Sequence, residues 1–234
     1  MLVAHVAAQL RARPADSVVL AAGATLAAPR FVPCGAKPPA AVFDVDETVL
    51  LNLGFESDDA AHPGRPYDER RWQAWERTGA GRASATPGAR EALTALRAMG
   101  VAVIFNTNRS AANVAATEAL LVENGLGPAR HGETLFVAGD DPGGSRKDGR
   151  RATIAARYCV IAMAGDQLGD FSDLFNDRLA PVARRAATQA EPIARLWGAG
   201  WFVLPNPVYG TALRGGVDEV FPADKRWAPP TVEK

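Results

Sequence analysis

Residues 41–52 read Ala-Val-Phe-Asp-Val-Asp-Glu-Thr-Val-Leu-Leu-Asn, and the fold can be worked out from them. The apolar run that ends at Phe43 is typical of a strand buried on both faces of a parallel sheet. Asp44 and Asp46 follow it, at the strand end where open α/β sheets bind ligands. Asp-x-Asp alone more often marks a solvated acidic turn. The longer string Asp-x-Asp-Glu-Thr-Val-Leu, directly after a buried strand, is much more specific and favours a catalytic site.

Length and composition exclude several classes of protein. The chain has 234 residues, 47% of them apolar, which suits one α/β domain with an insertion. Its formal net charge is zero, so we expect no broad attraction to nucleic acid or to an anionic membrane. No apolar run is long enough to span a bilayer. The N-terminus has no basic segment followed by an apolar one, so no signal peptide is recognisable in the sequence.

The two cysteines, Cys34 and Cys159, form no metal-binding pattern. Each precedes a predicted strand, and these two strands are expected to be neighbours. A disulfide is therefore geometrically conceivable, but two free buried thiols are the favoured interpretation.

Strand and helix patterns alternate along the chain. A helix is predicted over residues 2–12, followed by a connecting segment, 13–39, laid against the core. Further helices are predicted to open at Thr86-Pro87, at Ser110 and near Lys147. The predicted strands cover residues 40–43, 101–105, 134–138, 158–164 and 201–204. This alternation predicts parallel strands with right-handed crossovers, that is, an α/β fold with a Rossmann-like parallel sheet sandwiched by helices.

Residues 53–86 break the alternation, because they are too long for an ordinary strand-to-helix loop. The segment is rich in Gly, Pro and Asp and then holds a short helical piece with Trp72 and Trp75. We expect a small, mainly helical cap, inserted after the first core strand and placed over the carboxyl end of the sheet. The predicted core then comprises residues 40–52 and 87–234, with residues 1–39 packed on it.

Polar side chains follow two further predicted strands. Residues 106–110, Asn-Thr-Asn-Arg-Ser, place a hydroxyl and backbone N–H groups at a helix start, which is typical of a phosphate site. Simple capping of the next helix explains them equally well. Residues 165–171, Gly-Asp-Gln-Leu-Gly-Asp-Phe, add Asp166 and Asp170 to the carboxylates of Asp44 and Asp46. So many carboxylates at one point need a cation, and oxygen ligands suit Mg²⁺.

Lys147 starts the helix before the strand that leads to Asp166. A lysine there can hold a phosphate oxygen and offset the negative charge of the carboxylates. A basic run at a helix start is more often a solvated face, and the neighbouring Arg146 and Arg150 compete for the same role.

Together these strings resemble the four motifs of the haloacid dehalogenase (HAD) superfamily. Motif I is Asp44/Asp46, motif II Thr107, motif III Lys147 and motif IV Asp166/Asp170. Residues 44–52, 165–171 and 204–210 are further similar to the bacterial class C nonspecific acid phosphatases, also called DDDD or lipoprotein acid phosphatases. The similarity extends from residue 40 to about residue 214.

The resemblance implies a Mg²⁺-dependent acid phosphatase that hydrolyses small phosphomonoesters, with nucleoside monophosphates among the candidates. Asp44 would form an aspartyl-phosphate and Asp46 would act as general acid and base. Mg²⁺ would be held by Asp44, Asp46 (through its main-chain carbonyl) and Asp166, with Asp170 beside them. Thr107, Asn108 and Lys147 would bind the phosphate, and Phe55 would stack on the substrate. Trp72 and Trp75 are interpreted as the cap's own core, since their spacing puts both on one helical face.

Two departures from that family leave an alternative open. Gln167 stands where the family usually has Asn, and Leu51-Asn-Leu-Gly-Phe55 stands where it usually has Asp-Asn-Ser-Pro-Tyr. The chain could therefore be a catalytically weak or inactive envelope protein that binds phosphate esters or nucleotides on the same fold. By resemblance alone we expect a location in the periplasm or cell envelope, and a homodimer is compatible with the family.

A competing motif occurs at residues 130–134, Arg-His-Gly-Glu-Thr, which spell the signature of the histidine phosphatases. In that group the histidine follows a strand and becomes phosphorylated. Here the preceding residues, 125–129, contain Gly and Pro and cannot form a central strand. His131 is therefore predicted to be a surface loop residue.

Overall fold

The computed structural model describes residues 1–176, 179–206, 208–210, 214–220, 223 and 226–227. Its centre is a five-stranded sheet with the order β7-β6-β3-β8-β9, in which every pairing is parallel. The strands are β3 (Pro39–Phe43), β6 (Ala102–Ser110), β7 (Leu135–Ala138), β8 (Cys159–Gly165) and β9 (Trp201–Val203). The predicted α/β fold is confirmed.

Strand β3 lies in the middle of the sheet and is buried on both faces. Ala41 and Phe43 pack into one hydrophobic cluster, whereas Ala40 and Val42 pack into the other. Successive side chains of a strand point to opposite faces, so both sets must be apolar when helices cover both sides. This is why the sequence before Asp44 is continuously apolar and does not alternate.

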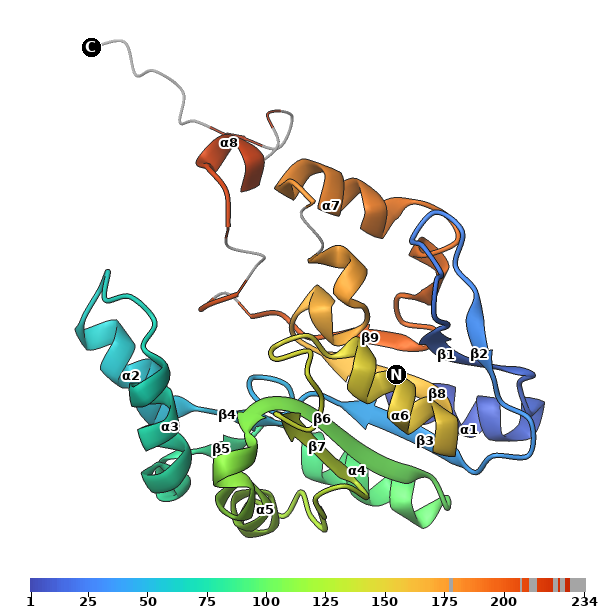
Figure 1. Ribbon diagram of the computed structural model, residues 1–234, viewed down its shortest axis with the longest axis horizontal. Coiled ribbons are helices and arrows are strands. Elements are labelled where there is room, and N and C mark those ends of the chain that lie inside the picture. Colours follow the sequence, from blue (N-terminus) through green and yellow to red (C-terminus); the bar gives the residue numbers. More distant parts are fainter. Residues whose placement is uncertain (177–178, 207, 211–213, 221–222, 224–225, 228–234) are drawn as a thin grey trace.

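Two layers cover the sheet (Figure 1). Helices α1 (Leu2–Ala12), α4 (Ala89–Ala98) and α5 (Val114–Glu123) lie on one face and bury Val6, Leu93, Leu96 and Leu121. Helix α6 (Asp148–Arg157) lies on the other face and buries Ile154 and Ala155. The core therefore lies on both sides of β3. This packing fixes the position of the end of β3, where Asp44 and Asp46 follow.

The N-terminal region holds more structure than expected. The predicted helix over residues 2–12 is confirmed as α1. Residues 13–39, expected to be a plain connection, instead contain an antiparallel pair, β1 (Asp16–Leu20) and β2 (Phe31–Pro33). The indole N–H of Trp201 donates to the carbonyl of Val18 at 2.8 Å. Such short strands carry a weak local signal, and contacts with β8 and β9 stabilise them.

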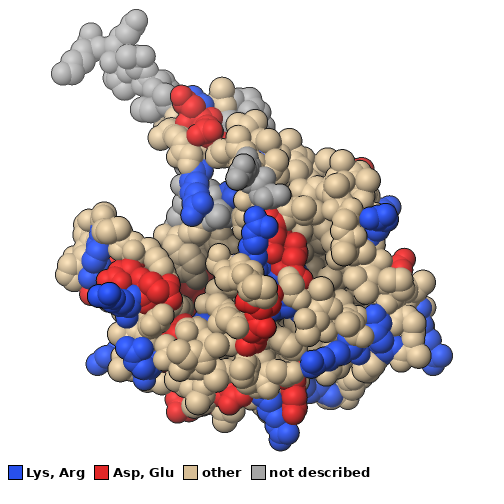
Figure 2. Space-filling view, viewed as in Figure 1, with Lys and Arg blue, Asp and Glu red and all other residues tan. Residues whose placement is uncertain are grey.

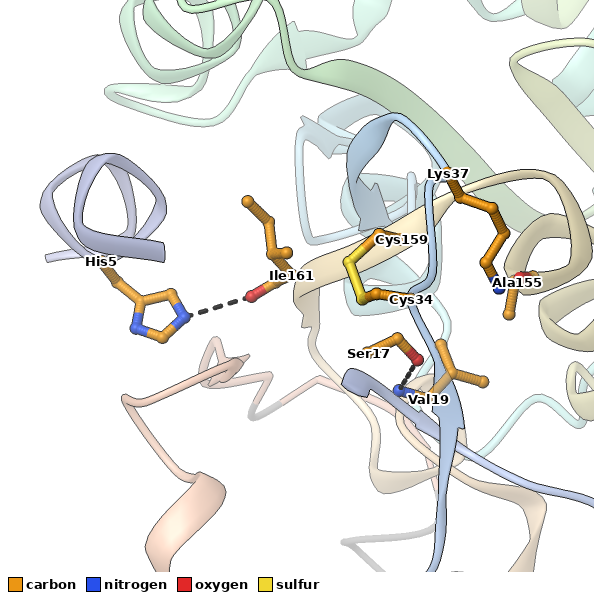
Figure 3. Close-up of a disulfide and its surroundings, with 8 residues drawn as sticks. All are labelled: His5, Ser17, Val19, Cys34, Lys37, Ala155, Cys159 and Ile161. Carbon is orange, nitrogen blue, oxygen red and sulfur yellow. Dashed lines mark hydrogen bonds between the residues drawn. A yellow bond between two sulfur atoms is a disulfide. The ribbon is translucent and has the colours of Figure 1, made fainter. Parts of the chain in front are cut away.

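Cys34 and Cys159 form a disulfide, so the prediction of two free thiols was wrong (Figure 3). The Cα atoms lie 4.6 Å apart. The amide of Cys34 donates to the carbonyl of Ala15, and the amide of Cys159 donates to that of Pro38. The β1–β2 pair thus brings Cys34 alongside the start of β8, a long-range contact that spacing along the chain does not reveal.

The end of β6 differs from the predicted strand end, and this difference affects the site. Strand β6 runs to Ser110, whereas the sequence predicted an end at Phe105, so Thr107 and Arg109 lie on extended backbone. The Ser110 hydroxyl does cap the next turn, accepting from the amide of Ala112 at 3.2 Å. A 3₁₀ turn, Ala111–Asn113, then precedes α5, and α4 begins at Ala89, two residues after the expected Pro87.

Residues 53–86, which we call the cap segment, lie beyond the carboxyl ends of the strands (Figure 1). They form α2 (Leu53–Ala61), α3 (Glu69–Thr78), the 3₁₀ turn Ala80–Arg82 and β5 (Ser84–Ala85), which pairs with β4 (Leu50–Leu51). Glu76 of α3 is 3% exposed and accepts from the amide of Ser110 at 2.9 Å and from Asn113 Nδ2 at 2.6 Å. This buried carboxylate fixes α3 against the end of β6.

The C-terminal third of the chain adds several short helical elements after β8. They are the 3₁₀ turns Leu168–Asp170, Asp173–Phe175 and Ala194–Leu196 and the helices α7 (Pro181–Gln189) and α8 (Val217–Val220). An aromatic cluster joins these turns to β9 and consists of Phe171, Phe175, Trp197 and Trp201. Over the described residues, no helix combines the length and apolar character needed to cross a membrane.

Candidate active site

A cavity of about 620 Å³ lies between the cap segment and the carboxyl edge of the sheet. The hollow between the two parts can be followed in Figure 2. Its core side carries the polar residues that follow β3, β6 and β8, and its cap side carries aromatic and charged residues of α2, α3 and the loop between them. The lining includes Asp44, Asp46, Asn108, Lys147, Asp166 and Asp170 from the core and Phe55, Glu56, Asp59, Arg65, Tyr67 and Trp72 from the cap.

Three buried carboxylates meet on the core side of the cavity. Asp44, Asp166 and Asp170 each offer an oxygen atom, and these atoms lie within 4.8 Å of one another. Lys147 Nζ donates to Asp44 and, at 2.6 Å, to Asp170 Oδ1. The Thr48 hydroxyl lies 3.3 Å from both Asp44 Oδ2 and Asp166 Oδ1, so it bridges motifs I and IV.

The turn after β8 brings Asp170 back towards the sheet. A side chain at Gly165 would put its Cβ 2.3 Å from Asp170 Cβ, so only glycine allows this approach. Asp170 Oδ2 accepts from the amide of Gln167 at 2.8 Å. Arg151 Nη1 donates to the carbonyls of Gly169 and Asp170 at 2.9 Å each. The turn is therefore held by hydrogen bonds on both sides.

The charges of this cluster are only partly balanced. Burial raises the pKa of Asp44, Asp170 and Asp166 raise it further, and Lys147 opposes the rise. The pKa of Asp166 is also raised by burial and by Asp170. Burial lowers the pKa of Lys147, but Asp170 and Asp44 together outweigh it and the net pKa is raised. A second cation beside the three oxygen donors would relieve this repulsion, and an all-oxygen donor set suits Mg²⁺.

Asp46 has different partners from Asp44, although only one residue separates them. Its Oδ1 accepts from Arg109 Nε at 2.9 Å, from Arg109 Nη2 at 2.7 Å and from Asn52 Nδ2 at 2.9 Å. Its Oδ2 lies 3.3 Å from the Thr107 hydroxyl. Arg109 and Asn52 are both fully buried. The Asp46 carboxylate is thus directed at its own cation, Arg109, while Asp46 as a residue still lines the cavity.

The two residues predicted to bind phosphate from the end of β6 differ in position. Thr107 is fully buried behind Asp46 and is absent from the described lining of the cavity. Asn108 lies on the wall, where its Nδ2 donates to the carbonyl of Ser145 at 3.0 Å and its Oδ1 accepts from Arg150 at 2.7 Å. Arg150 also donates to the carbonyl of Thr107, so it fixes this end of the strand.

Phe55 lies on the cap side of the cavity and is 7% exposed. Trp72 meets its ring edge-on with the centroids 4.9 Å apart, and the Arg71 guanidinium lies 4.0 Å from its centroid. The Trp75 ring lies 6.1 Å away, and its Nε1 donates to Asn52 Oδ1 at 2.9 Å. These rings form a small cluster within the cap, and Phe55 and Trp72 also reach the cavity.

A family model described as HAD superfamily, subfamily IIIB (acid phosphatase), matches residues 2–212. The chain belongs to this subfamily. It is therefore an acid phosphatase, a phosphomonoester hydrolase of the HAD superfamily. The resemblance to the HAD superfamily and its acid phosphatases that was inferred from the sequence is confirmed.

Solved structures support the same relationship. The class C acid phosphatase from Bacillus anthracis is 28% identical, with a TM-score of 0.65 over 75% of this chain and 69% of the other. A structure of that enzyme with tungstate bound is 29% identical, with a TM-score of 0.63 over 74% and 69% of the two chains. No curated protein matches the sequence.

Sequence reasoning assigned no contact in the candidate site to Asn206, Tyr209 or Glu47, and noted Gln167 only as a departure from the family. Asn206 Nδ2 and Gln167 Nε2 donate to Asp166 Oδ2 at 2.7 and 2.8 Å, and the Tyr209 hydroxyl donates to Glu47 Oε2 at 2.6 Å. Residues 204–210 were noted only for their resemblance, and Pro207 among them lies outside the described residues. The position of Arg109, two residues after Thr107 on a strand, could have indicated that it faces the site.

His131 lies outside the candidate active-site cavity. Its side chain is 41% exposed and its Nε2 lies 2.7 Å from Asp140 Oδ1. It is not among the described residues that line the cavity. A phosphohistidine mechanism therefore finds no support in its surroundings.

Proposed function

We propose that this acid phosphatase hydrolyses phosphomonoesters in a Mg²⁺-dependent reaction through an aspartyl-phosphate on Asp44. One observation carries the proposal. The two carboxylates of motif I share a cavity but have separate cations, Lys147 for Asp44 and Arg109 for Asp46. Two carboxylates in different environments are suited to different tasks, one as a nucleophile and the other as an acid and base.

In the first step, a carboxylate oxygen of Asp44 attacks phosphorus and the bond to the ester oxygen breaks. Asp46 gives its proton to the departing alkoxide, which leaves as an alcohol. In the second step, Asp46 takes a proton from water, and the water oxygen attacks the phosphorus of the aspartyl-phosphate. Inorganic phosphate leaves and Asp44 is restored. Splitting the reaction in this way replaces one difficult step with two easier ones.

Phosphoryl transfer depends mainly on positioning and electrostatics. Lys147 and Asn108 line the cavity on the core side and can contact the phosphate oxygens. Thr107 lies behind Asp46, so its hydroxyl is better placed to orient that carboxylate than to contact substrate in this conformation. Asp44, Asp166 and Asp170, with the main-chain carbonyl of Asp46, would hold Mg²⁺, which supplies positive charge for the attack of one anion on another.

For the substrate, we propose that the cap segment contacts the leaving group, with nucleoside monophosphates as the first class to test. A cavity of about 620 Å³ has room for a group of that size. Phe55, Tyr67 and Trp72 bring three aromatic rings to its cap side. Aromatic rings of this kind bind planar bases by stacking.

We also propose a location in the periplasm or cell envelope. The disulfide between Cys34 and Cys159 supports it, because disulfides persist in oxidising compartments. The likeness to a bacterial class C acid phosphatase points to the same place.

The test is hydrolysis of p-nitrophenyl phosphate at mildly acidic pH, with Mg²⁺, with EDTA, and with EDTA followed by excess Mg²⁺. We expect turnover that is lost in EDTA and restored by Mg²⁺. Adenosine monophosphate and glycerol phosphate, assayed next by phosphate release, would compare a base-bearing substrate with one that has no ring. Turnover indifferent to EDTA would contradict the metal-dependent scheme. Tight nucleotide binding without phosphate release would favour the inactive binding protein.

A further inference from the structure

The buried polar network around Asp46 is larger than a reaction at Asp44 requires. We infer that Arg109 and Asn52 are positioning residues that hold the Asp46 carboxylate in the direction needed for proton transfer and link it to the cap segment. The inference rests on the proposed function, because it assumes that Asp46 is the general acid. It assigns a role to two residues that neither touch the three-carboxylate cluster nor line the cavity.

Arg109 and Asn52 hold Asp46 from two sides, and we call this pair of residues the clamp. Three N–H groups converge on Oδ1, two from Arg109 and one from Asn52, all between 2.7 and 2.9 Å. Arg109 Nη2 also donates to Asn52 Oδ1 at 2.9 Å, so the two clamp residues are bonded to each other. A closed set of this kind leaves Asp46 one orientation, with only Oδ2 outside the clamp. A guanidinium is well suited to it, because its donors have a fixed planar geometry.

Because the clamp residues are buried, removing one of them carries a large free-energy penalty. Arg109 and Asn52 are both 0% exposed. Removing one member of a buried ion pair leaves the other charge without compensation, which is strongly unfavourable. Without Arg109, the Asp46 side chain would therefore reorient towards Lys147 or towards solvent in the cavity. Either change moves the proton donor away from the leaving group.

The clamp also touches the cap segment. Asn52 Oδ1 accepts from Trp75 Nε1 at 2.9 Å, and the Arg109 guanidinium lies 5.5 Å from the centroid of the Trp72 ring. Glu76, on the same helix, accepts from the amide of Ser110, next to Arg109. Helix α3 therefore contacts both ends of the clamp. A shift of α3 on substrate binding would be transmitted to Asp46 through Asn52.

The test compares two substrates whose leaving groups differ in their need for a proton. Glycerol phosphate releases an alkoxide that needs protonation, whereas p-nitrophenolate leaves readily without it. For Arg109→Gln we expect kcat/KM, which covers the steps up to release of the alcohol, to fall about 10²-fold on glycerol phosphate, the lower end of the contribution of a general acid, and to fall much less on p-nitrophenyl phosphate. Arg109→Lys should recover only part of the loss, because an ammonium cannot donate in the same plane. Arg97→Gln is the control, since Arg97 donates to the carbonyls of Leu126 and Pro128, far from the site.

A double-mutant cycle separates positioning from a general structural role. In an Asp46→Asn background, Arg109→Gln should change kcat/KM on glycerol phosphate by less than about threefold, because residues that act as a unit are not additive. An undiminished loss in that background, or an equal loss of kcat/KM on both substrates, would overturn the inference and leave the proposed function standing. Full turnover by Asp46→Asn itself on glycerol phosphate would overturn both. Trp75→Phe, which removes one donor to Asn52 and keeps a ring, provides a milder version if Arg109→Gln fails to fold. It should show the same substrate bias at smaller size, and an unbiased effect would contradict the link to the cap.

Discussion

The carboxyl edge of the sheet and the cap segment form two sides of one cavity but are built in opposite ways. At the sheet edge, charged side chains are buried and each has several fixed partners, as Asp44 and Lys147 show. In the cap, apart from Glu76, several charged side chains pair with one another near solvent, as the exposed Asp58 does with Arg65 and with the half-buried Arg71. Exposed pairs contribute little to stability, whereas buried groups demand fixed geometry. The comparison supports our proposal that the sheet edge carries the chemistry and that the cap selects the substrate.

The largest expected effect tests the sheet edge directly. Asp44→Asn removes the proposed nucleophile and keeps the shape of the side chain. Turnover of p-nitrophenyl phosphate should fall by at least about 10⁴-fold, while the protein stays folded. Asp59→Asn is the matched control, because Asp59 lines the same cavity from the cap side. Its kcat should stay close to wild type. Turnover by Asp44→Asn comparable to wild type would break the comparison.

Removing the disulfide sharpens the comparison, because it should destabilise the sheet and the N-terminal region and leave the cap segment untouched. The disulfide joins Cys34 to the start of β8 (Figure 3), and the other end of β8 leads to Asp166. Cys34→Ser with Cys159→Ser should lower the free energy of unfolding by about 2–5 kcal/mol, measured by urea titration. KM should not change, because the cap is untouched.

Reduction provides the control for that variant. Dithiothreitol should bring the wild type to the stability of the double variant and leave the variant itself unchanged. A variant as stable as the oxidised wild type would show that the bond contributes nothing.

Phe55 tests the cap side alone. Phe55→Ala should raise KM for adenosine monophosphate about tenfold, which corresponds to about 1.4 kcal/mol, and leave KM for glycerol phosphate nearly unchanged. Phe55→Leu keeps the apolar volume that packs against Trp72 and Arg71 but removes the ring. If Leu restores KM, packing within the cap explains the effect. If neither variant moves KM for the nucleotide, the stacking prediction fails.

The smallest expected effect concerns Glu56, a half-buried carboxylate on the cap side of the cavity. Burial raises the pKa of Glu56 to about 7, from an ordinary value of 4.5. A raised folded-state pKa means that the stabilising contribution is full below pH 4.5 and is lost as the pH rises through 7. Glu56→Gln should therefore increase stability at pH 8 by about 1 kcal/mol, after allowance for solvent screening, and have little effect at pH 4.

Thermal unfolding of Glu56→Gln in EDTA at the two pH values measures this difference. Glu91→Gln, at an exposed position of α4, is the control. A stabilisation that is equal at pH 4 and pH 8 would exclude protonation of Glu56 as its cause.

Most of the architecture was predictable because it follows from local patterns. The buried strand before Asp44, the strand that leads to Asp166 and helix α1 were predicted to within a residue or two. The β1–β2 pair was not, because such short strands form through contacts with distant parts of the chain. The disulfide was judged wrongly for the same reason, since it depends on where β2 places Cys34.

The candidate site divides in the same way. By itself, the sequence determined that Asp44, Asp46, Lys147 and Asp166 would gather at one edge of a parallel sheet, because the carboxyl ends of neighbouring strands meet there. Only the tertiary structure decided which cation each carboxylate faces, because that depends on side-chain directions across strands far apart in the chain. Arg109 meets Asp46 across 63 positions and Lys147 meets Asp44 across 103. Motifs fix which residues meet at the site, and packing fixes their partners.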